Sequence, residues 1–307
     1  MSGLSAVPNA TPHAEDIASA MIRTSLRILT AYLLVTAIPL IMWSYSAGSW
    51  WALAAHAAAL GTAGFFSRGV RKSARALQDW IPLALGPFLY IELRWIIEGA
   101  GQAHADALVA GWETRLFGLQ PSQSLALRWP SLALSEFLHL CYLSYYALVY
   151  VPPALLWIKR RRAEFAATNL ALVIVYALCF VLYAVMPVDG PRYLSGPSMS
   201  PAGPIRDLVM RVLASASSRG TAFPSSHVAA SVVAAICALR FQGKLGWLVT
   251  ALAVGLGLGA VYGGYHYGVD VAAGVVTGFV AAAVARSLER GMNRESSGTE
   301  RQAVDLR

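Results

Sequence analysis

Long apolar runs restrict what this chain can fold into more than any other feature of its sequence. Eight such runs occur, at about 26–44, 50–66, 80–97, 135–157, 166–187, 226–241, 246–263 and 268–286. A helix of roughly 20 apolar residues crosses about 30 Å of hydrocarbon and satisfies its own backbone hydrogen bonds there. The sequence therefore predicts an all-α, polytopic membrane bundle of about eight transmembrane helices, several of them short for a full crossing.

Composition supports the membrane assignment. The chain is 57% hydrophobic and 13% charged, with a mean hydropathy of +0.54, whereas soluble domains are about 45–50% apolar. Its net charge of +8 arises from Lys and Arg gathered in short loops between the runs, where they set topology, so we exclude nucleic acid as a partner. Cys141, Cys179 and Cys237 lie inside apolar runs, which argues against a disulfide framework or a zinc site.

The basic residues predict how the chain is oriented. If the eight runs alternate in direction, one side of the membrane collects Arg23 and Arg27, Arg68 to Arg75, Lys159 to Arg162, Arg240 with Lys244, and Arg286 to Arg294. Positive loops stay in the cytoplasm. We therefore expect a protein integral to a cytoplasmic membrane, with both termini inside. Its richness in Ala, Arg and Gly is typical of a bacterial chain.

The chain is predicted to form one membrane-embedded domain, residues 23–286, between two polar tails. Residues 1–22 lack the basic start and early apolar core of a signal peptide, so the first run is expected to be retained. Residues 287–307 are highly charged and are predicted to be disordered. In the outward loops, residues 106–118 and 204–214 carry apolar side chains at helical spacing, which predicts two interfacial helices.

Two histidines and one aspartate form the most informative pattern. His227 opens the run 226–241, and His266 follows it by 39 residues, just before the last run. That interval fits one helix across the membrane and one back, so both imidazoles should emerge on the same, outward side. Asp270 lies one helical turn beyond His266 and can accept its N–H. This predicts a nucleophilic His266 oriented by Asp270, with His227 as general acid and base.

Phosphate is the electrophile that the surrounding residues suit. Ser225 and Ser226 stand at a helix start, whose unpaired N–H groups attract anions. Arg192 offers a fork for phosphate oxygens, and Tyr193 beside it is a further candidate phosphate ligand. Arg219 is either another phosphate ligand or an interfacial anchor. Phosphoryl transfer depends mainly on positioning and charge stabilisation. We expect no metal and no other cofactor, because no carboxylate cluster accompanies the histidines.

Other ionisable residues are interpreted as structural. A lone histidine in an apolar chain more often packs than reacts, and this applies to His13, His56, His104 and His139. Glu92, Arg94 and Glu98 are expected to pair with one another rather than to contact a substrate headgroup. The H-x-x-x-D pattern on its own also fits a buried ion pair or part of a metal site. The catalytic interpretation of the pattern is favoured because His227 is expected on the same side of the membrane.

The motifs FPSSHVA and Tyr265 to Gly274 resemble the second and third signature motifs of the type 2 phosphatidic acid phosphatase and vanadium haloperoxidase superfamily. The resemblance implies a six-helix membrane core, here with extra N-terminal helices. It implies that His266 becomes a phosphohistidine, that Asp270 orients it and that His227 is the acid and base. It also implies that Ser225 and the backbone at Ser226 bind phosphate.

The sequence departs from the usual pattern of that superfamily in its first motif and at the position six residues before His266. Arg192 is followed by Tyr193 instead of proline, Val185 replaces a lysine, and Ala260 replaces an arginine. Fewer cations favour a less charged substrate, such as a phosphodiester. In this respect, and in GWETRLFGLQPS (111–122), the chain is similar to the branch that contains inositol phosphorylceramide synthases.

Three functions follow as hypotheses. The first is a lipid phosphatase, towards which the sequence leans. The second is a phosphotransferase that moves a phosphorylated headgroup between lipids, so that an alcohol replaces water. The third, of another class, is a non-catalytic lipid transporter or scaffold. The lipid, the acceptor and the oligomeric state stay open at this point.

Overall fold

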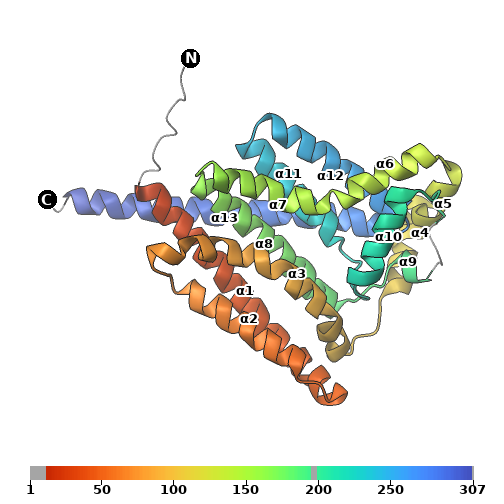
Figure 1. Cartoon of the computed structure of the whole chain (residues 1–307), viewed down its shortest axis with the longest axis horizontal. Helices are drawn as coiled ribbons and strands as arrows, with labels where there is room; N and C mark the ends of the chain where they lie inside the picture. The colour runs from red at the N-terminus through yellow and green to blue at the C-terminus, as the bar shows by residue number, and fades with distance from the viewer. Residues whose placement is uncertain (1–11, 195–198, 306–307) are drawn as a thin grey trace.

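The computed structural model of the chain describes residues 12–194 and 199–305, and within them it is helical (Figure 1). The helices are α1 (Pro12–Ala47), α2 (Trp51–Ser67), the 3-10 turn η1 (Lys72–Ala74), α3 (Arg75–Ala100), α4 (Asp106–Phe117), α5 (Pro121–Arg128), α6 (Leu132–Leu143), α7 (Tyr145–Ile158), α8 (Arg162–Val185), α9 (Pro191–Leu194), α10 (Pro204–Ala216), α11 (Ser226–Phe241), α12 (Lys244–Tyr262) and α13 (Gly268–Asp305). The only strand pairing in these ranges is an isolated bridge between Val188 and Thr221. The all-α prediction is confirmed.

Five of these helices, α1, α3, α8, α12 and α13, are long and apolar enough to cross a membrane, and α6 with α7 makes a sixth if the bent pair is one span. Leucine, valine and isoleucine side chains of α1 are exposed on its outer face, as expected against lipid: Leu34, Val35 and Ile38. α2 and α11 have only 17 and 16 residues. All eight predicted runs coincide with helices, but a total of eight crossings is not confirmed.

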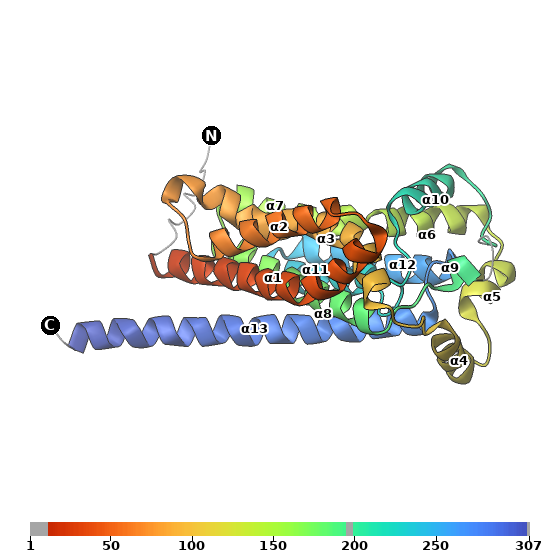
Figure 2. The same ribbon diagram turned by 90° about the horizontal axis from the view of Figure 1, so that it is seen from below.

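The bundle has two distinct ends. The start of α1 and the end of α13 lie at one end, whereas α4, α5, α9 and α10 cover the other (Figures 1 and 2). The segments predicted to be interfacial, 106–118 and 204–214, form α4 and α10 at this covered end. The loops that carry Arg68 to Lys72 and Lys159 to Arg161 lie at the opposite end. These basic loops are thus separated from the covered end along the long axis of the bundle.

Close packing of α11 on α13 depends on two glycines. A Cβ at Gly274 would lie 2.6 Å from the backbone oxygen of Ser225, and one at Gly278 would lie 2.7 Å from that of Ala229. Only residues without a side chain allow the two backbones to approach so closely. The result is that the start of α11, with His227, lies directly beside the first turns of α13.

The helix between 132 and 158 is broken, although the sequence suggested one continuous run over 135–157. α6 and α7 meet at Ser144 with a bend of 44°. The Ser144 hydroxyl donates to the carbonyl of Cys141 at 2.6 Å, and a side chain that bonds to the helical ladder in this way commonly accompanies a kink. Tyr142 and Tyr145 stand on either side of the break.

Both ends of the predicted domain differ from the observed helix bounds. α1 begins at Pro12, and Ile17 and Met21 are buried in the core, so part of the segment expected to be a polar tail packs with the bundle. Residues 1–11 of that tail lie outside the described residues. α13 continues to Asp305 through the segment predicted to be disordered. Its Glu, Arg and Gln residues are good helix formers, and the assignment of this segment as a separate tail stays a prediction.

Candidate active site

Two loops that carry sequence motifs are joined at the covered end of the bundle. Val188 N–H donates to the carbonyl of Gly220 at 3.2 Å, and Ala222 N–H donates to that of Val188 at 2.8 Å. A side chain reinforces the pair, because Asp189 accepts from Gly220 N–H at 2.9 Å. These contacts bring the segment with Arg192 beside the segment that leads into α11.

The histidines meet where the spacing predicts. His266 lies in the turn between α12 and α13, and its Nδ1 is 3.4 Å from Asp270 Oδ2. Asp270 is itself fixed, since the same oxygen accepts from the N–H of Tyr267 at 2.8 Å. The rings of His227 and His266 have centroids 6.5 Å apart. The Nδ1 edge of the His266 ring thus faces Asp270 of α13 without forming a hydrogen bond to it, and the ring also contacts the backbone of Ala222.

Burial lowers the basicity of the His266 imidazole. Its residue surface is 6% exposed, and desolvation lowers the pKa of its imidazole to about 4; a backbone contact with Ala222 opposes this shift and the Arg192 guanidinium adds to it. A pKa so far below neutrality leaves the ring uncharged at pH 7. An uncharged imidazole keeps the lone pair that a nucleophile requires.

Arg192 and Tyr193 share a small polar cavity with the two histidines. The cavity has a volume of about 30 Å³ and is lined by Tyr90, Tyr142, Asp189, Arg192, Tyr193, Leu213, Ser217, Ser218, Thr221, Ala222, His227, Tyr265 and His266. Arg192 donates to the hydroxyls of Tyr193 and Ser217, the latter at 2.6 Å. Arg219 rests on the Tyr193 ring, 5.0 Å from its centroid, and does not line the cavity. Arg192 is therefore the one arginine among the residues that line this cavity.

Ser225 and Ser226 are placed differently from the sequence expectation. Ser225 caps α11, its hydroxyl accepting from Val228 N–H at 3.4 Å, and its own N–H donates to the carbonyl of Asp270 at 3.0 Å. The N–H of Ser226 donates to the hydroxyl of Tyr183 at 3.0 Å. Both serines are buried and neither lines the polar cavity. Their observed contacts join α8, α11 and α13, and phosphate binding by them stays a prediction.

Three tyrosines surround His227, a feature that the sequence analysis missed. Tyr142 stacks on the imidazole at 5.5 Å between centroids, Tyr145 lies at 4.1 Å, and Tyr90 approaches edge-on at 6.3 Å. Beyond them lies an apolar cavity of about 120 Å³, lined by Gly86, Pro87, Tyr90, Ile91, Tyr145, Tyr146, Tyr150, Tyr176, Phe180 and His227. His227 therefore separates a polar cavity from an apolar one.

Two carboxylates of α4, also missed, hold the loops that carry Arg192 and His266. Asp106 accepts from the N–H groups of Asp189 and Gly190, both at 2.9 Å. Glu113, which is fully buried, accepts from those of Gly268 and Val269, both at 2.9 Å.

Residues seven apart lie on the same face of a helix, so one face of α4 ties the Arg192 loop to the segment that follows His266. The sequence offered a signal for this arrangement, namely two acids seven residues apart in a mainly apolar helix. The apolar residues Leu108, Leu116 and Phe117 are exposed on α4, which leaves the acids as the face that packs inward.

The residues set aside as structural have structural contacts. His56 bonds to Glu92 at 2.8 Å and, through its other nitrogen, to the carbonyl of Leu33. The expected mutual pairing of Glu92, Arg94 and Glu98 is wrong: Glu98 accepts from Trp43, and Arg94 lies over the Trp95 ring. These three side chains leave α3 in different directions, and the buried one, Glu92, bonds to His56 of α2.

His104 and His139 also have partners. His139 Nδ1 bonds to the carbonyl of Ser135 at 2.6 Å. His104 Nδ1 lies 3.0 Å from Asp189, and together with Asp106 the three side chains could offer ligand atoms within 4.8 Å of one another. Both Asp106 oxygens and one Asp189 oxygen already accept backbone N–H groups, so we interpret the group as a clamp on the loop. The side chain of His13 lies outside the described residues.

Fold and site together define a polytopic helical membrane protein with a pair of histidines, a carboxylate and an arginine at one end of its bundle. A sequence model of the PAP2 superfamily matches residues 109–284, more than half of the chain, and the chain belongs to that superfamily. The match spans α4 to α13 and includes every residue of the polar cavity except Tyr90. No curated protein and no solved structure matches the chain. The superfamily is confirmed, whereas the inositol phosphorylceramide synthase-like branch is not.

Proposed function

We propose that the chain is a membrane-embedded phosphoryl-transfer enzyme that acts on a lipid phosphate ester through a phosphohistidine at His266. One observation carries the proposal: His266, whose pKa is lowered to about 4 by burial and whose Nδ1 lies 3.4 Å from Asp270, lines a single polar cavity together with His227 and Arg192. Nucleophile, orienting carboxylate, proton donor and anion ligand are the groups that a covalent phosphoryl transfer requires. In the proposal, His266, Asp270, His227 and Arg192 take these four roles in that order.

The first half-reaction forms the phosphoenzyme. Nε2 of His266 attacks phosphorus while the bond from phosphorus to the ester oxygen breaks, and His227 gives its proton to the departing oxygen. Asp270 stabilises the positive charge that develops on the His266 ring. His266 would approach phosphorus to about 3–3.5 Å and His227 would donate to the ester oxygen at about 2.6–3.2 Å, so the two rings, whose centroids lie 6.5 Å apart, have to separate as the phosphoryl group enters.

The second half-reaction regenerates the enzyme. His227, now without its proton, takes one from the incoming water or alcohol, whose oxygen attacks phosphorus as the bond to His266 breaks. Arg192 offsets the charge of the phosphoryl oxygens in both halves. A cavity of about 30 Å³ holds about one water molecule, so Arg192 has to exchange its bonds to Tyr193 and Ser217 for bonds to the substrate. Ser225, Ser226 and Arg219 belong to the proposal as further phosphate ligands.

The apolar cavity supports a lipid as the substrate. The ester oxygen must lie beside His227 to receive its proton, and the far side of His227 borders the cavity between α3, α7 and α8. An apolar chain attached to that oxygen would therefore leave the phosphate on the polar side and enter the tyrosine-lined side. We further propose that the site faces the outside of the cytoplasmic membrane, because the basic loops belong to the other end of the bundle.

Hydrolysis is the activity we propose first, and transfer to an alcohol is the second candidate. Transfer is favoured by the enclosed aromatic cavity, where the hydroxyls of Tyr145 and Tyr176 bond to each other at 2.7 Å and could receive an acceptor alcohol. Transfer also fits the reduced positive charge of the site. Ala260, which stands where the superfamily usually has an arginine, is fully buried, and its carbonyl accepts from the N–H groups of Tyr265 and His266.

The test uses the full chain in lipid nanodiscs, supplied with phosphatidic acid, a polyprenyl diphosphate, or phosphatidylinositol with ceramide or diacylglycerol. Free phosphate and new phospholipids are followed by mass spectrometry, beside His266→Ala checked for folding by thermal unfolding. Free phosphate that disappears in the variant supports hydrolysis, and a new phospholipid without free phosphate supports transfer. Absence of both, or products that survive in His266→Ala, would overturn the enzyme proposal and favour the non-catalytic transporter or scaffold.

A further inference from the structure

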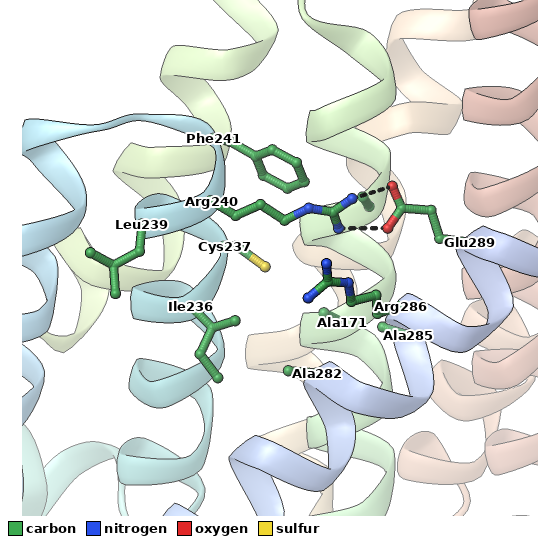
Figure 3. A pocket seen from close by; sticks show the side chains of 11 residues that line it. Ala171, Ile236, Cys237, Leu239, Arg240, Phe241, Ala282, Ala285, Arg286 and Glu289 are labelled. Atoms are coloured by element: carbon green, nitrogen blue, oxygen red, sulfur yellow. Dashed lines mark hydrogen bonds and ion pairs between the residues drawn. The ribbon is translucent and has the colours of Figure 1, made fainter.

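A second groove opens far from the histidines, between α8, α11 and α13 (Figure 3). Its volume is about 370 Å³, and it is lined by Ala167, Ala171, Ile236, Cys237, Leu239, Arg240, Phe241, Ala282, Ala285, Arg286 and Glu289. Arg240 lies thirteen residues beyond His227 on α11, a rise of about 20 Å. The groove therefore belongs to the end of the bundle that the positive loops assign to the cytoplasm.

The groove is apolar along its length and charged at its mouth. Alanines on α8 and α13 face the aliphatic side chains of α11 and leave an open width between the helices. Arg240 lies in the last turn of α11, at the level where a membrane-spanning helix reaches the lipid headgroups. A narrow apolar groove with cationic side chains at headgroup depth complements both parts of an anionic phospholipid, its acyl chain and its phosphate.

The charges at the mouth are not balanced. Both carboxylate oxygens of Glu289 are used by Arg240, at 2.6 and 2.9 Å. Arg286, one turn earlier on α13, points from α13 towards α11 in Figure 3. Among the side chains that the structure describes, no carboxylate lies within ion-pair distance of its guanidinium. The mouth thus keeps one arginine whose charge is not neutralised by the protein.

We propose that this groove binds one anionic phospholipid of the inner leaflet, with its phosphate on Arg286 beside Arg240 and an acyl chain along the alanines. Arginine suits phosphate because its fork can donate two parallel hydrogen bonds, and basic pockets between transmembrane helices on the cytoplasmic side accommodate acidic headgroups. The bound lipid would bridge α8, α11 and α13, the three helices whose other ends hold Tyr183, His227 and Asp270.

Native mass spectrometry of the full chain in neutral detergent measures this binding directly, with phosphatidylglycerol and phosphatidylcholine as probes. The wild type is expected to retain one phosphatidylglycerol in preference to phosphatidylcholine. Arg286→Gln should weaken retention about fivefold or more, whereas Arg290→Gln, which removes the same charge from an exposed position of α13 outside the groove, should change it less than twofold. Ala282→Leu keeps every charge and fills the groove, so it should also weaken retention.

Equal losses in Arg286→Gln and Arg290→Gln would overturn the site in favour of general surface charge. The absence of a preference for phosphatidylglycerol in the wild type would overturn it as well, and so would full retention in Ala282→Leu. The same measurement on His266→Ala should match the wild type, because the groove does not depend on the chemistry proposed for the histidines. Failure of either proposal therefore leaves the other intact.

Discussion

At the scale of single residues, the environment of His266 decides what the site can do. The groups that face its ring are Asp270 from α13, Arg192 from α9 and His227 from α11, with Asp189 in the same cavity. Burial and Arg192 both disfavour the charged imidazole, and in the proposed mechanism Asp270 orients the ring. The reactivity proposed for neutral pH would thus depend on the packing around one side chain.

The lowered pKa of His266 predicts a displaced acid limb in the pH profile. Activity requires the uncharged ring, and with a pKa of about 4 the ring stays uncharged far below the ordinary histidine pKa of about 6.5. As the pH is lowered, we therefore expect protonation of His266 to reduce kcat/KM only when the pH approaches about 4. Arg192→Gln removes a positive charge and should move that limb upward. A limb between pH 6 and 7 in the wild type would contradict the assignment of His266 as the free-enzyme base.

Removal of the orienting carboxylate gives a second prediction. Asp270→Asn keeps the shape but offers His266 an amide, so the reactive tautomer is no longer favoured, and kcat should fall by about 10²- to 10⁴-fold. Substrate affinity should change much less, because Asp270 does not line the polar cavity. Single-turnover kinetics distinguish the two effects. A change confined to KM would refute the orienting role.

At the scale of helices, α4 sets the distance between the Arg192 loop and His266. Glu113→Gln leaves one N–H of Gly268 or Val269 without its acceptor, at a cost of about 1–3 kcal/mol in unfolding free energy. The resulting displacement should lower kcat about tenfold or more. Activity assays beside thermal unfolding measure both effects.

Glu136→Gln is the matched control for α4, because Glu136 also accepts two consecutive N–H groups, those of Ile205 and Arg206 at the start of α10. This variant should lose stability with little change in kcat. Equal loss of kcat in both variants would show that the effect of Glu113 is only one of stability.

The junction of α11 and α13 yields another prediction at this scale. Gly274→Ala would push a methyl group against the Ser225 carbonyl, 2.6 Å from the new Cβ, and overpacking of this kind costs about 1–3 kcal/mol. Gly291→Ala is the control on the same helix, since no atom lies within 4 Å of its Cβ position, and it should be neutral or stabilising. Thermal unfolding of the pair tests the requirement for close backbone approach.

At the scale of the whole molecule, the predicted orientation can be tested with added cysteines, because Cys141, Cys179 and Cys237 are all buried. Leu119 is exposed between α4 and α5, and Lys244 is exposed at the start of α12. In intact cells a membrane-impermeant maleimide should label Leu119→Cys, and it should label Lys244→Cys only after permeabilisation. The reverse pattern would invert the topology and place the histidines on the cytoplasmic side.

Sequence reasoning succeeded where geometry is local or set by helix length. Asp270 follows His266 by one turn, and the span from His227 to His266 equals two crossings, so their meeting could be predicted without knowledge of packing. The neighbours Tyr90, Tyr145 and Glu113 could not be found in this way, because they come from helices far apart in sequence whose rotation is fixed only when the bundle packs. The same limit explains why Glu98 was assigned the wrong partner.

The position of His227 between a polar and an apolar cavity makes the proposed phosphoenzyme a branch point. Under the proposed mechanism, water would reach the phosphoryl group from one side of the imidazole and a lipid alcohol from the other, and both would give their proton to His227. The two outcomes would then compete kinetically for one intermediate. The ratio of free phosphate to transferred product would follow the mole fraction of alcohol in the bilayer, so that membrane composition, rather than the protein alone, would set the balance between hydrolysis and synthesis.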